Sequence, residues 1–517
     1  MHSYPLYEHP NITTFAGLLS ANAAKIPDNT AFQYTEKKRL VTVTHRQFQR
    51  NVVALSAFLQ GLGNRTVAIL GENSYFWILT FFAAVHASKI AVPLDKELNA
   101  GELGSLLRRF DAPVLVCSDA YMDVAEKLLD GGFVERVISM ADYPQILSVN
   151  GGSNSSPAVA ADEDAVCSVF FTSGTTGQPK GVMLTQKNMM LDAINACRNL
   201  KVSGGSVLTL PLHHTFGFTV GVLAELMYGY PIYISRGLRH FRNELKEYRP
   251  QNLILVPLYV ETMYKNIWKA AREKGKEKTL KRLLAFSRFL RRCGIDIRRR
   301  LLHPVLASLG GELEEIVCGG AFLDQRYIDG LADFGIQVLN GYGITECSPV
   351  VAVNRNKYSQ KNSVGLPLPN VEVRIDDGEV CVKGETVMAG YYHDDAATRD
   401  AFCDGWYRTG DLGCLDRNGF LFITGRKKNL IILSNGENVS PEELEEKLSR
   451  IPGVEEVLVF EKNGAICAEI YPEDAAGIRE RVSELNKTLP AHKRINDIRF
   501  RAEPFEKTTT KKIKRHA

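Results

Sequence analysis

Hydrophobic and polar residues follow two different periods along the first part of the chain. Short apolar runs at 67–70 (VAIL), 90–94 (IAVPL) and 113–117 (PVLVC) predict buried strands. Longer runs between them, at 75–85 and 103–110, predict helices, the first of them buried in the core. Strands that alternate with helices are typical of an α/β domain with largely parallel pairing.

The two ends of the chain have patterns of their own. The pattern of residues 15–59 predicts short helices, interrupted by one strand at 39–44 (RLVTVT). After residue 426 the pattern predicts a helix at 442–448, strands at 456–460 and 465–471, and a helix at 476–488. Ser440 is expected to cap the first of these helices, with Pro441 at its first position.

We therefore expect an α/β protein with two domains. The larger, residues 1–426, would layer mixed sheets with helices, and residues 427–517 would form a small α+β lid. A length of 517 residues agrees, because it exceeds what one hydrophobic core usually serves.

Composition excludes several classes of protein. A net charge of +4 is small for this length, and no nucleic-acid-binding motif is present, so we expect no nucleic-acid partner. The ten cysteines include no paired CxxC, which favours reduced thiols in a cytoplasmic protein over disulfides or a zinc site. The first residues lack the basic and apolar regions of a signal peptide.

The strongest candidate for chemistry is the segment FFTSGTTGQPKG at 170–181. A strand at 166–171 leads into it, and a helix is expected to open within 182–190. A strand, a loop of glycines and hydroxyls, and a helix bring backbone N–H groups and a lysine around a phosphate chain. The spacing is not that of Walker A, so the loop indicates ATP but not a P-loop NTPase. The candidate residues are Thr172, Ser173, Gly174, Thr175, Thr176, Gly177 and Lys180.

Two further strands run into glycine-rich segments. The run 315–321 (EIVCGGA) ends in Gly320 and Ala321, small residues against which an adenine ring could lie. The strand at 337–339 precedes NGYGITE, where we expect Tyr342 to stack on the base and Thr345 to bind the α-phosphate. Glu346 suits Mg²⁺, because that ion prefers oxygen ligands. The nucleotide-binding candidates in this segment are Asn340, Gly341, Tyr342 and Gly343.

Isolated polar residues near the end of the large domain complete the candidate site. Asp411, in WYRTGDLG at 406–413, is a carboxylate that can accept from two ribose hydroxyls. Arg426 follows a strand at 420–424 and can reach ribose or phosphate.

A strand at 206–212 carries His213 and His214 into a loop.

Together these motifs resemble the adenylate-forming superfamily, which includes acyl-CoA synthetases, firefly luciferases and nonribosomal adenylation domains. The resemblance covers nearly the whole chain and is greatest to bacterial medium- and long-chain fatty acid–CoA ligases. It implies that Lys512, in EKTTTKKIKR at 506–515, is the catalytic lysine and that Lys428 is the hinge of a mobile lid. The chain departs from the family at Lys511, where glycine is usual. His214 would line the acyl and pantetheine tunnel, and Thr172 would assist Glu346 with the metal.

The resemblance implies a two-step reaction with ATP, Mg²⁺ and CoA. A carboxylic acid would form an acyl-adenylate and release pyrophosphate, and a thiol would then displace AMP. The family's Asp for an amino-acid ammonium is missing, which favours an acid without an α-amino group. A ligase that loads the phosphopantetheine of an acyl carrier protein, an aryl or other carboxylate ligase, and a non-catalytic relative remain alternatives.

A basic stretch at 265–300 alternates leucines and phenylalanines with clusters of lysine and arginine. A solvated helix face is the simpler interpretation. The functional alternative is contact with anionic lipid headgroups or with the phosphates of CoA.

Overall fold

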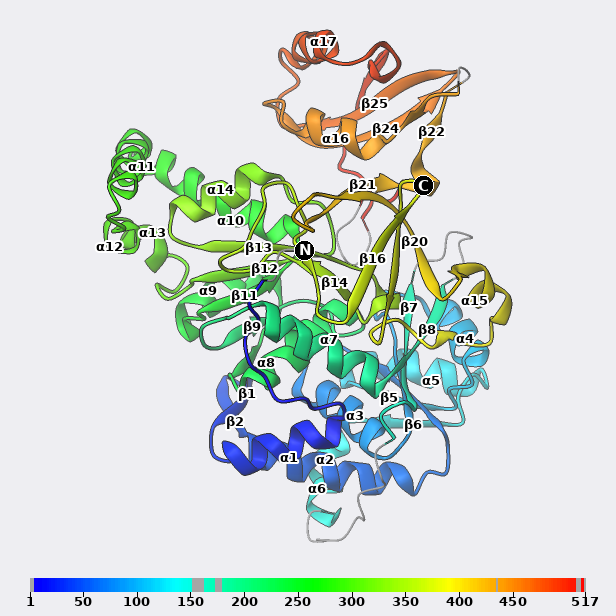
Figure 1. Ribbon diagram of the computed structural model, residues 1–517. Coiled ribbons are helices and arrows are strands. Elements are labelled where there is room, and N and C mark those ends of the chain that lie inside the picture. Colours follow the sequence, from blue (N-terminus) through cyan, green and yellow to red (C-terminus); the bar gives the residue numbers. More distant parts are fainter. Residues whose placement is uncertain (1–3, 151–161, 173–178, 434–435, 508–512, 516–517) are drawn as a thin grey trace.

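The computed structural model describes residues 4–150, 162–172, 179–433, 436–507 and 513–515 (Figure 1). One mixed sheet has the strand order β15-β14-β13-β12-β11-β9-β10-β1-β2, and its inner strands are parallel. Its strands are β15 (Leu366–Pro367), β14 (Val350–Val353), β13 (Gln337–Gly343), β12 (Glu315–Cys318), β11 (Asn252–Leu255), β9 (Ser206–Leu208), β10 (Ile232–Ile234), β1 (Thr30–Glu36) and β2 (Arg39–Thr44).

A second mixed sheet has the order β18-β8-β7-β4-β3-β5-β6. It comprises β18 (Gly390–Tyr391), β8 (Lys180–Thr185), β7 (Val166–Thr172), β4 (Ile90–Pro93), β3 (Thr66–Leu70), β5 (Val114–Cys117) and β6 (Arg136–Ser139). A smaller antiparallel sheet contains β16 (Val371–Asp376), β17 (Glu379–Gly384), β19 (Phe402–Cys403), β20 (Trp406–Leu415) and β21 (Leu421–Arg426).

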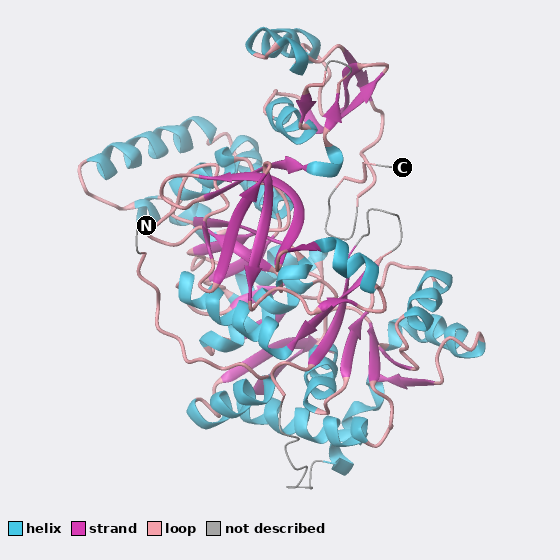
Figure 2. Cartoon of the chain, turned by 45° about the vertical axis from the view of Figure 1, so that its right-hand side comes forward, coloured by secondary structure: helices cyan, strands magenta, loops and turns pink. Residues whose placement is uncertain are grey.

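Helices pack against these sheets and between them (Figure 2). They are α1 (Phe15–Lys25), α2 (His45–Gln60), α3 (Tyr75–His86), α4 (Ala100–Arg109), α5 (Met122–Asp130), α6 (Tyr143–Asn150), α7 (Gln186–Asn199), α8 (Glu225–Tyr228), α9 (Leu238–Tyr248), α10 (Pro257–Glu273), α11 (Glu277–Arg292), α12 (Arg298–Leu301), α13 (His303–Ala307), α14 (Gln325–Asp333) and α15 (Asp395–Ala401). Helix α3 is apolar on all sides and buried, as its sequence predicts.

A smaller unit at the C-terminal end has its own core and lies at one end of the molecule (Figures 1 and 2). It contains β22 (Ile431–Ile432), β23 (Asn438–Val439), α16 (Pro441–Ser449), β24 (Val454–Lys462), β25 (Ala465–Pro472), α17 (Ile478–Thr488) and β26 (Asp497–Phe500). The predicted helices and strands of this part of the chain are confirmed. A large α/β domain and a small α+β domain are thus present.

Polar contacts join the small unit to the larger one. Lys265 of α10 lies 3.0 Å from Glu455, which is on β24. Arg450, at the end of α16, lies 2.8 Å from Asp324, which caps the start of α14. These contacts fix one orientation of the two units in this structure.

Two strands of the largest sheet differ from the prediction. Residues 30–36, expected within helical pieces, form β1, which pairs with β2 and β10. The expected strand at 206–212 ends at Leu208, because the chain turns there toward Pro211 and the histidines. β1 forms a hairpin with the neighbouring β2 and also pairs with β10, which is distant in the sequence, and local periodicity does not report the second pairing.

The N-cap prediction at Ser440 is correct in position and wrong in mechanism. Ser440 is the N-cap of α16, but its hydroxyl accepts no bond from a backbone N–H of the first turn. It donates instead to the backbone oxygen of Thr424 on β21, at 2.9 Å. The residue therefore connects the first helix of the small unit to the last strand of the large one.

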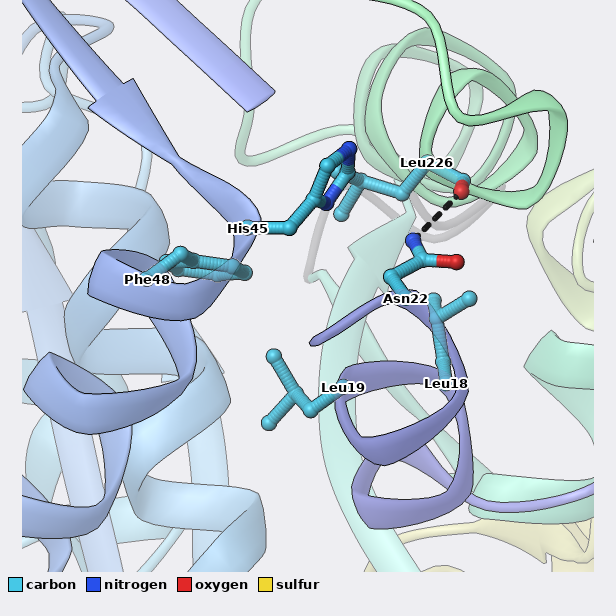
Figure 3. A pocket seen from close by; sticks show the side chains of 6 residues that line it. All are labelled: Leu18, Leu19, Asn22, His45, Phe48 and Leu226. Atoms are coloured by element: carbon cyan, nitrogen blue, oxygen red, sulfur yellow. Dashed lines mark hydrogen bonds between the residues drawn. The ribbon is translucent and has the colours of Figure 1, made fainter. Parts of the chain in front are cut away.

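His45 is buried in the core between α1, α2 and α8 and is 2% exposed. Figure 3 shows it beside a small hollow that Leu19, Phe48 and Leu226 also line. Burial lowers the pKa of His45 from 6.5 to about 4, although a hydrogen bond with the backbone of Gly229 opposes the shift.

Folding stability should consequently depend on pH through this imidazole. Below pH 6.5 the unfolded chain binds a proton that the folded chain refuses until about pH 4, so stability falls as the pH drops through this range. We expect His45→Gln to reduce the loss between pH 7 and pH 4.5 by on the order of 1–2 kcal/mol. Urea unfolding at several pH values measures the effect.

The exposed His303 provides the matched control, and His303→Gln should leave the pH profile of the wild type unchanged. An unchanged profile in His45→Gln would show that another group causes the pH dependence.

Candidate nucleotide site

Three segments converge on the carboxylate of Asp411. The Tyr342 hydroxyl, on β13, donates to one carboxylate oxygen at 2.6 Å, and Nε of Arg426, on β21, donates to the other at 2.6 Å. The Asp411 side chain is only 4% exposed, whereas that of Arg426 is 43% exposed. Burial, and next the negative charge of Asp411, raise the pKa of Tyr342. The phenol therefore remains a neutral donor.

The β-sheet explains why these residues meet. Asp411 and Arg426 are direct partners in the β20–β21 ladder, so their side chains lie on the same face. Burial of Arg426 would by itself lower its pKa, but the Asp411 charge reverses the sign and the net shift is upward. The guanidinium therefore stays charged beside Asp411, and its other end is open to solvent.

A second group of residues lies around Glu346. The Tyr391 hydroxyl donates to Glu346 Oε1 at 3.0 Å and also lies 3.3 Å from the Tyr407 hydroxyl. The ammonium of Lys180 lies over the Tyr391 ring, 4.6 Å from its centroid. Burial and the Glu346 charge raise the pKa of Tyr391. Lys180 and Glu346, far apart in sequence, thus both contact one tyrosine that sequence reasoning did not select.

The segment predicted to bind phosphate is connected to its neighbours differently from the prediction. Residues 180–185 form β8, antiparallel to β7, with Thr172 paired to Lys180. The helix begins only at Gln186, after a capping box between Thr185 and Asn188. The expected arrangement of strand, loop and helix is therefore wrong, and the loop connects a hairpin. β8 is buried without a strict alternation, and its short apolar run at 182–184 fits a buried strand as well as the start of a helix.

Several predicted loop residues lie outside the described part of the chain, namely Ser173, Gly174, Thr175, Thr176 and Gly177. Lys512 also lies outside it. The described residues that flank Lys512 are attached to the small unit: Lys507 pairs with Glu456 at 2.5 Å, and Arg515 pairs with Glu445 at 2.5 Å. A β-bridge joins Lys507 to Ile513, so residues 508–512 connect two paired positions.

The NGYG segment was also expected to be a loop at a strand end, and this is wrong. β13 continues through Asn340, Gly341, Tyr342 and Gly343, changing from parallel pairing with β12 to antiparallel pairing with β14. Gly343 is required sterically, because a Cβ there would lie 2.1 Å from the backbone oxygen of Pro349. This close approach positions the short 3₁₀-helix that carries Thr345 and Glu346 (η4, Thr345–Cys347) directly after Tyr342.

The remaining predicted residues lie around these two groups. Gly320 has a φ of +88° and, like Ala321, is exposed after the end of β12. A Cβ on the preceding Gly319 would lie 3.1 Å from the ring of Phe216, which covers it. His214 follows β9 and lies beside His213, with 4.3 Å between ring centroids and the two rings tilted by 47°.

A second buried carboxylate, which the sequence analysis missed, organises the segment before Asp411. Glu379, on β17, accepts from Arg408 at 2.7 Å, from Lys427 at 2.9 Å and from the Gly410 N–H at 3.1 Å. Its side chain is 4% exposed. Burial tends to raise the pKa of Glu379, but these three donors outweigh it and lower the pKa.

Lys427 immediately precedes the predicted hinge residue, Lys428. Glu379 bonds both to Lys427 and to the strand that carries Asp411, so it connects that strand to the start of the predicted hinge. Both lysines belong to a 3₁₀ turn (η5, Lys427–Asn429). Burial, followed by the positive charge of Arg426, lowers the pKa of Lys428.

No cluster of three or more His, Cys, Asp or Glu side chains that could hold a metal ion occurs among the residues that the structure describes. Within the described residues, Glu346 therefore does not belong to a cluster of protein ligands. It suits an ion that takes its other oxygen ligands from phosphate and water, as Mg²⁺ does.

A family model described as "AMP-binding enzyme" matches residues 19–392, which include β7, β13 and Glu346. The chain belongs to the AMP-binding enzyme family. It is therefore an enzyme, of the acid–thiol ligase type.

Two relatives span most of the chain. It is 28% identical to a long-chain-fatty-acid–CoA ligase, FadD15, of Mycobacterium bovis (strain ATCC BAA-935 / AF2122/97), over 92% of this chain and 85% of the relative. It is also 28% identical to a 2-succinylbenzoate–CoA ligase of Listeria innocua serovar 6a (strain ATCC BAA-680 / CLIP 11262), over 85% of this chain and 84% of the relative.

Among solved structures, the anthranilate CoA ligase AuaEII in complex with anthranoyl-AMP superposes with a TM-score of 0.80. The two chains are 23% identical, and the match covers 99% of this chain and 96% of that one. The predicted fold is thereby confirmed.

Replacing Glu379 with glutamine tests its structural role. The variant leaves Arg408 and Lys427 without their shared carboxylate, and we expect the free energy of unfolding to fall by about 1–3 kcal/mol. The cations are nearly half exposed, so water limits the loss. Urea unfolding followed by tryptophan fluorescence measures it.

The matched control is Glu385→Gln, which removes a carboxylate that is 49% exposed and paired with Lys187. We expect less than about 0.5 kcal/mol there. Equal losses in both variants would contradict the special role of Glu379.

Proposed function

We propose that this chain activates a medium- or long-chain fatty acid with ATP and transfers the acyl group to CoA. The observation that carries the proposal is the Asp411 carboxylate between Tyr342 and Arg426, in a chain that belongs to the AMP-binding family. A buried carboxylate with a solvent-facing cation beside it can accept from the two hydroxyls of a ribose.

The nucleotide would extend from this carboxylate toward Glu346. Tyr342 would lie against the base, with Gly320, Ala321, Asn340 and Gly341 forming backbone walls around it. Thr345 and Glu346 follow Tyr342 on the same segment, so the phosphates would run along it toward Lys180. Lys180, with the hydroxyls and N–H groups of residues 172–177, would hold the distal phosphates by charge and hydrogen bonding.

The residues present fit magnesium. Glu346 Oε1 is held by Tyr391, which orients the carboxylate toward the side on which Lys180 lies. Glu346 and the Thr172 hydroxyl would contribute protein oxygens, and Mg²⁺ would neutralise phosphate charge during acyl transfer.

Lys512 would contact the carboxylate of the acid and the α-phosphate, and so stabilise the negative charge that develops as the acyl–phosphate bond forms. For the second step the small unit would turn about Lys428, and Lys512 would leave. The Glu379–Lys427 pair would keep the residue before the pivot on the large domain. One site could then serve both half-reactions, with His214 lining the path of the thiol.

The acid and the thiol are the finer parts of the proposal. The resemblance to the mycobacterial long-chain ligase favours a fatty acid, whereas similarity to the 2-succinylbenzoate ligases favours an aromatic acid as the second candidate. The acceptor would be CoA, with a phosphopantetheinylated carrier protein as the alternative.

Pyrophosphate release tests these assignments. We expect release with fatty acids of about six to sixteen carbons to exceed release with 2-succinylbenzoate or anthranilate, and the acyl group to appear on CoA. Higher turnover with the aromatic acids would establish the second candidate. Release followed by acylation of a holo carrier protein but not of CoA would transfer the acceptor assignment to the carrier.

The paired variants Lys512→Ala and Lys511→Ala test the catalytic lysine. Loss of one positioned charge typically costs on the order of 100-fold in rate. We expect that loss in Lys512→Ala and less than about threefold in Lys511→Ala. The reverse pattern would move the role to Lys511, and full activity in both would refute it.

A further inference from the structure

The arm formed by α11 and α12 has an unusual outer face. α11 packs Leu280 and Leu284 into a hydrophobic core that it shares with α10 and α14, and Ser287 is buried on the same face. The opposite face, at a spacing of three or four residues, carries Arg282, Phe286 and Phe289. The two phenylalanines are 51% and 61% exposed, and Ile295 just beyond the helix is 51% exposed.

Charge is concentrated on this arm. Residues 274–300 contain eleven lysines and arginines and only two carboxylates, Glu277 and Asp296, although the whole chain has a net charge of only +4. The rest of the chain is therefore net acidic, and the cations of the arm are a local feature.

Ion pairs neutralise only part of this charge. Arg288 and Arg291 both pair with Asp333 on α14, which fastens the helix to the domain, and Lys281 pairs with Glu277. Within the described ranges, no ion pair engages Lys278, Arg282 or Arg292 on the outer side. Exposed aromatic rings therefore lie among cations that have no carboxylate partner there.

The arm lies at the periphery of the molecule, on the side away from α15 and α4 (Figure 1). Its outer face can therefore approach a flat surface without a clash from the sheets. No helix in the described ranges has the length and apolar character to cross a membrane.

We propose that the outer face of α11, defined by Lys278, Arg282, Phe286, Phe289 and Arg292, binds the surface of an anionic lipid bilayer. An interfacial helix inserts aromatic side chains at the depth of the headgroups while its cations lie among lipid phosphates. Each cation near such a surface contributes through the negative surface potential, and salt screens the contribution. The mixture of phenylalanine and unpaired cations on one helix face matches this ligand in both respects.

Binding to vesicles can be measured without ATP or acid, so the inference does not rest on the proposed function. If both hold, the surface would place the enzyme where free fatty acids partition. Failure of vesicle binding would leave the acid-dependent release of pyrophosphate unaffected.

The experiment uses the full chain and sedimentation with vesicles of phosphatidylcholine, with and without 30% phosphatidylglycerol. We expect binding to the anionic vesicles that is at least about tenfold stronger and is lost in 0.5 M NaCl. The variant K278Q/R282Q/R292Q should weaken it by about 10- to 100-fold, and F286S/F289S by about tenfold.

Two matched controls remove the same groups elsewhere. K37Q/K38Q/R39Q deletes three exposed cations of the β1–β2 turn, and L40S/V149S deletes two exposed apolar side chains. Both should bind like the wild type. All variants should retain pyrophosphate release with a short, soluble acid, which shows that they are folded.

Three results would overturn the proposal. Equal binding by the arm variants and their controls would mean that net charge alone is responsible. A wild-type dimer that F286S/F289S converts to a monomer, without vesicle binding, would assign the face to a second copy of the chain. The third result is that the wild type binds an acidic carrier protein but no vesicles, and that only the arm variants lose this binding. That result would assign the outer face of α11 to the carrier protein.

Discussion

The buried carboxylate of Asp411 is the interaction on which the arrangement of the site depends. A carboxylate that is withdrawn from water is costly unless donors satisfy it, and Tyr342 and Arg426 both do so at 2.6 Å. These partners come from β13, of the largest sheet, and from β21, the last strand of the antiparallel sheet. One charged group therefore holds two sheets together at the place where the nucleotide is proposed to bind.

The same requirement links the site to the small unit. Glu379 is a second buried carboxylate on the antiparallel sheet, and one of its donors is Lys427, directly after Arg426. The chain thus leaves the large domain from a point that two ionic contacts hold. Beyond it, Ser440 returns to the backbone of Thr424, while Arg450 and Glu455 contact the outside of α14 and α10. Among the described residues, the small unit is held by ion pairs with partly exposed cations, by the Ser440 hydroxyl and by a bond from Arg326 to the backbone oxygen of Ser449. Ion pairs of partly exposed groups are individually weak.

The elements with strong local signals could be predicted from the sequence. The uniformly apolar run of α3, the strands β3, β4 and β5, and the helices α16 and α17 were all predicted within a few residues. β1 and β8 were not, because a short segment can fit a helix as well as a strand, and because one partner of each, β10 and β18, lies far away in the sequence. The predicted site residues Tyr342, Asp411 and Arg426 do meet, although they lie on three different strands, because each belongs to a motif that the family resemblance assigns to one nucleotide site.

Other parts of the site required the three-dimensional arrangement. Tyr391 and Glu379 are single residues in ordinary strands, and their roles arise only from partners that lie 45 and 48 residues away. The steric need for Gly343 likewise comes from Pro349, where the chain folds back on itself. None of these contacts is visible in the periodicity or the composition of the sequence.

The most direct test of this account compares AMP with 2′,3′-dideoxy-AMP for binding to the wild type and to Asp411→Asn. If Asp411 accepts from the ribose hydroxyls, the substitution should weaken AMP binding by about 10- to 100-fold, because charge-assisted hydrogen bonds are lost. It should scarcely change the binding of dideoxy-AMP. An equal loss for both nucleotides would show that Asp411 only supports the fold, and no loss for either would place the ribose elsewhere.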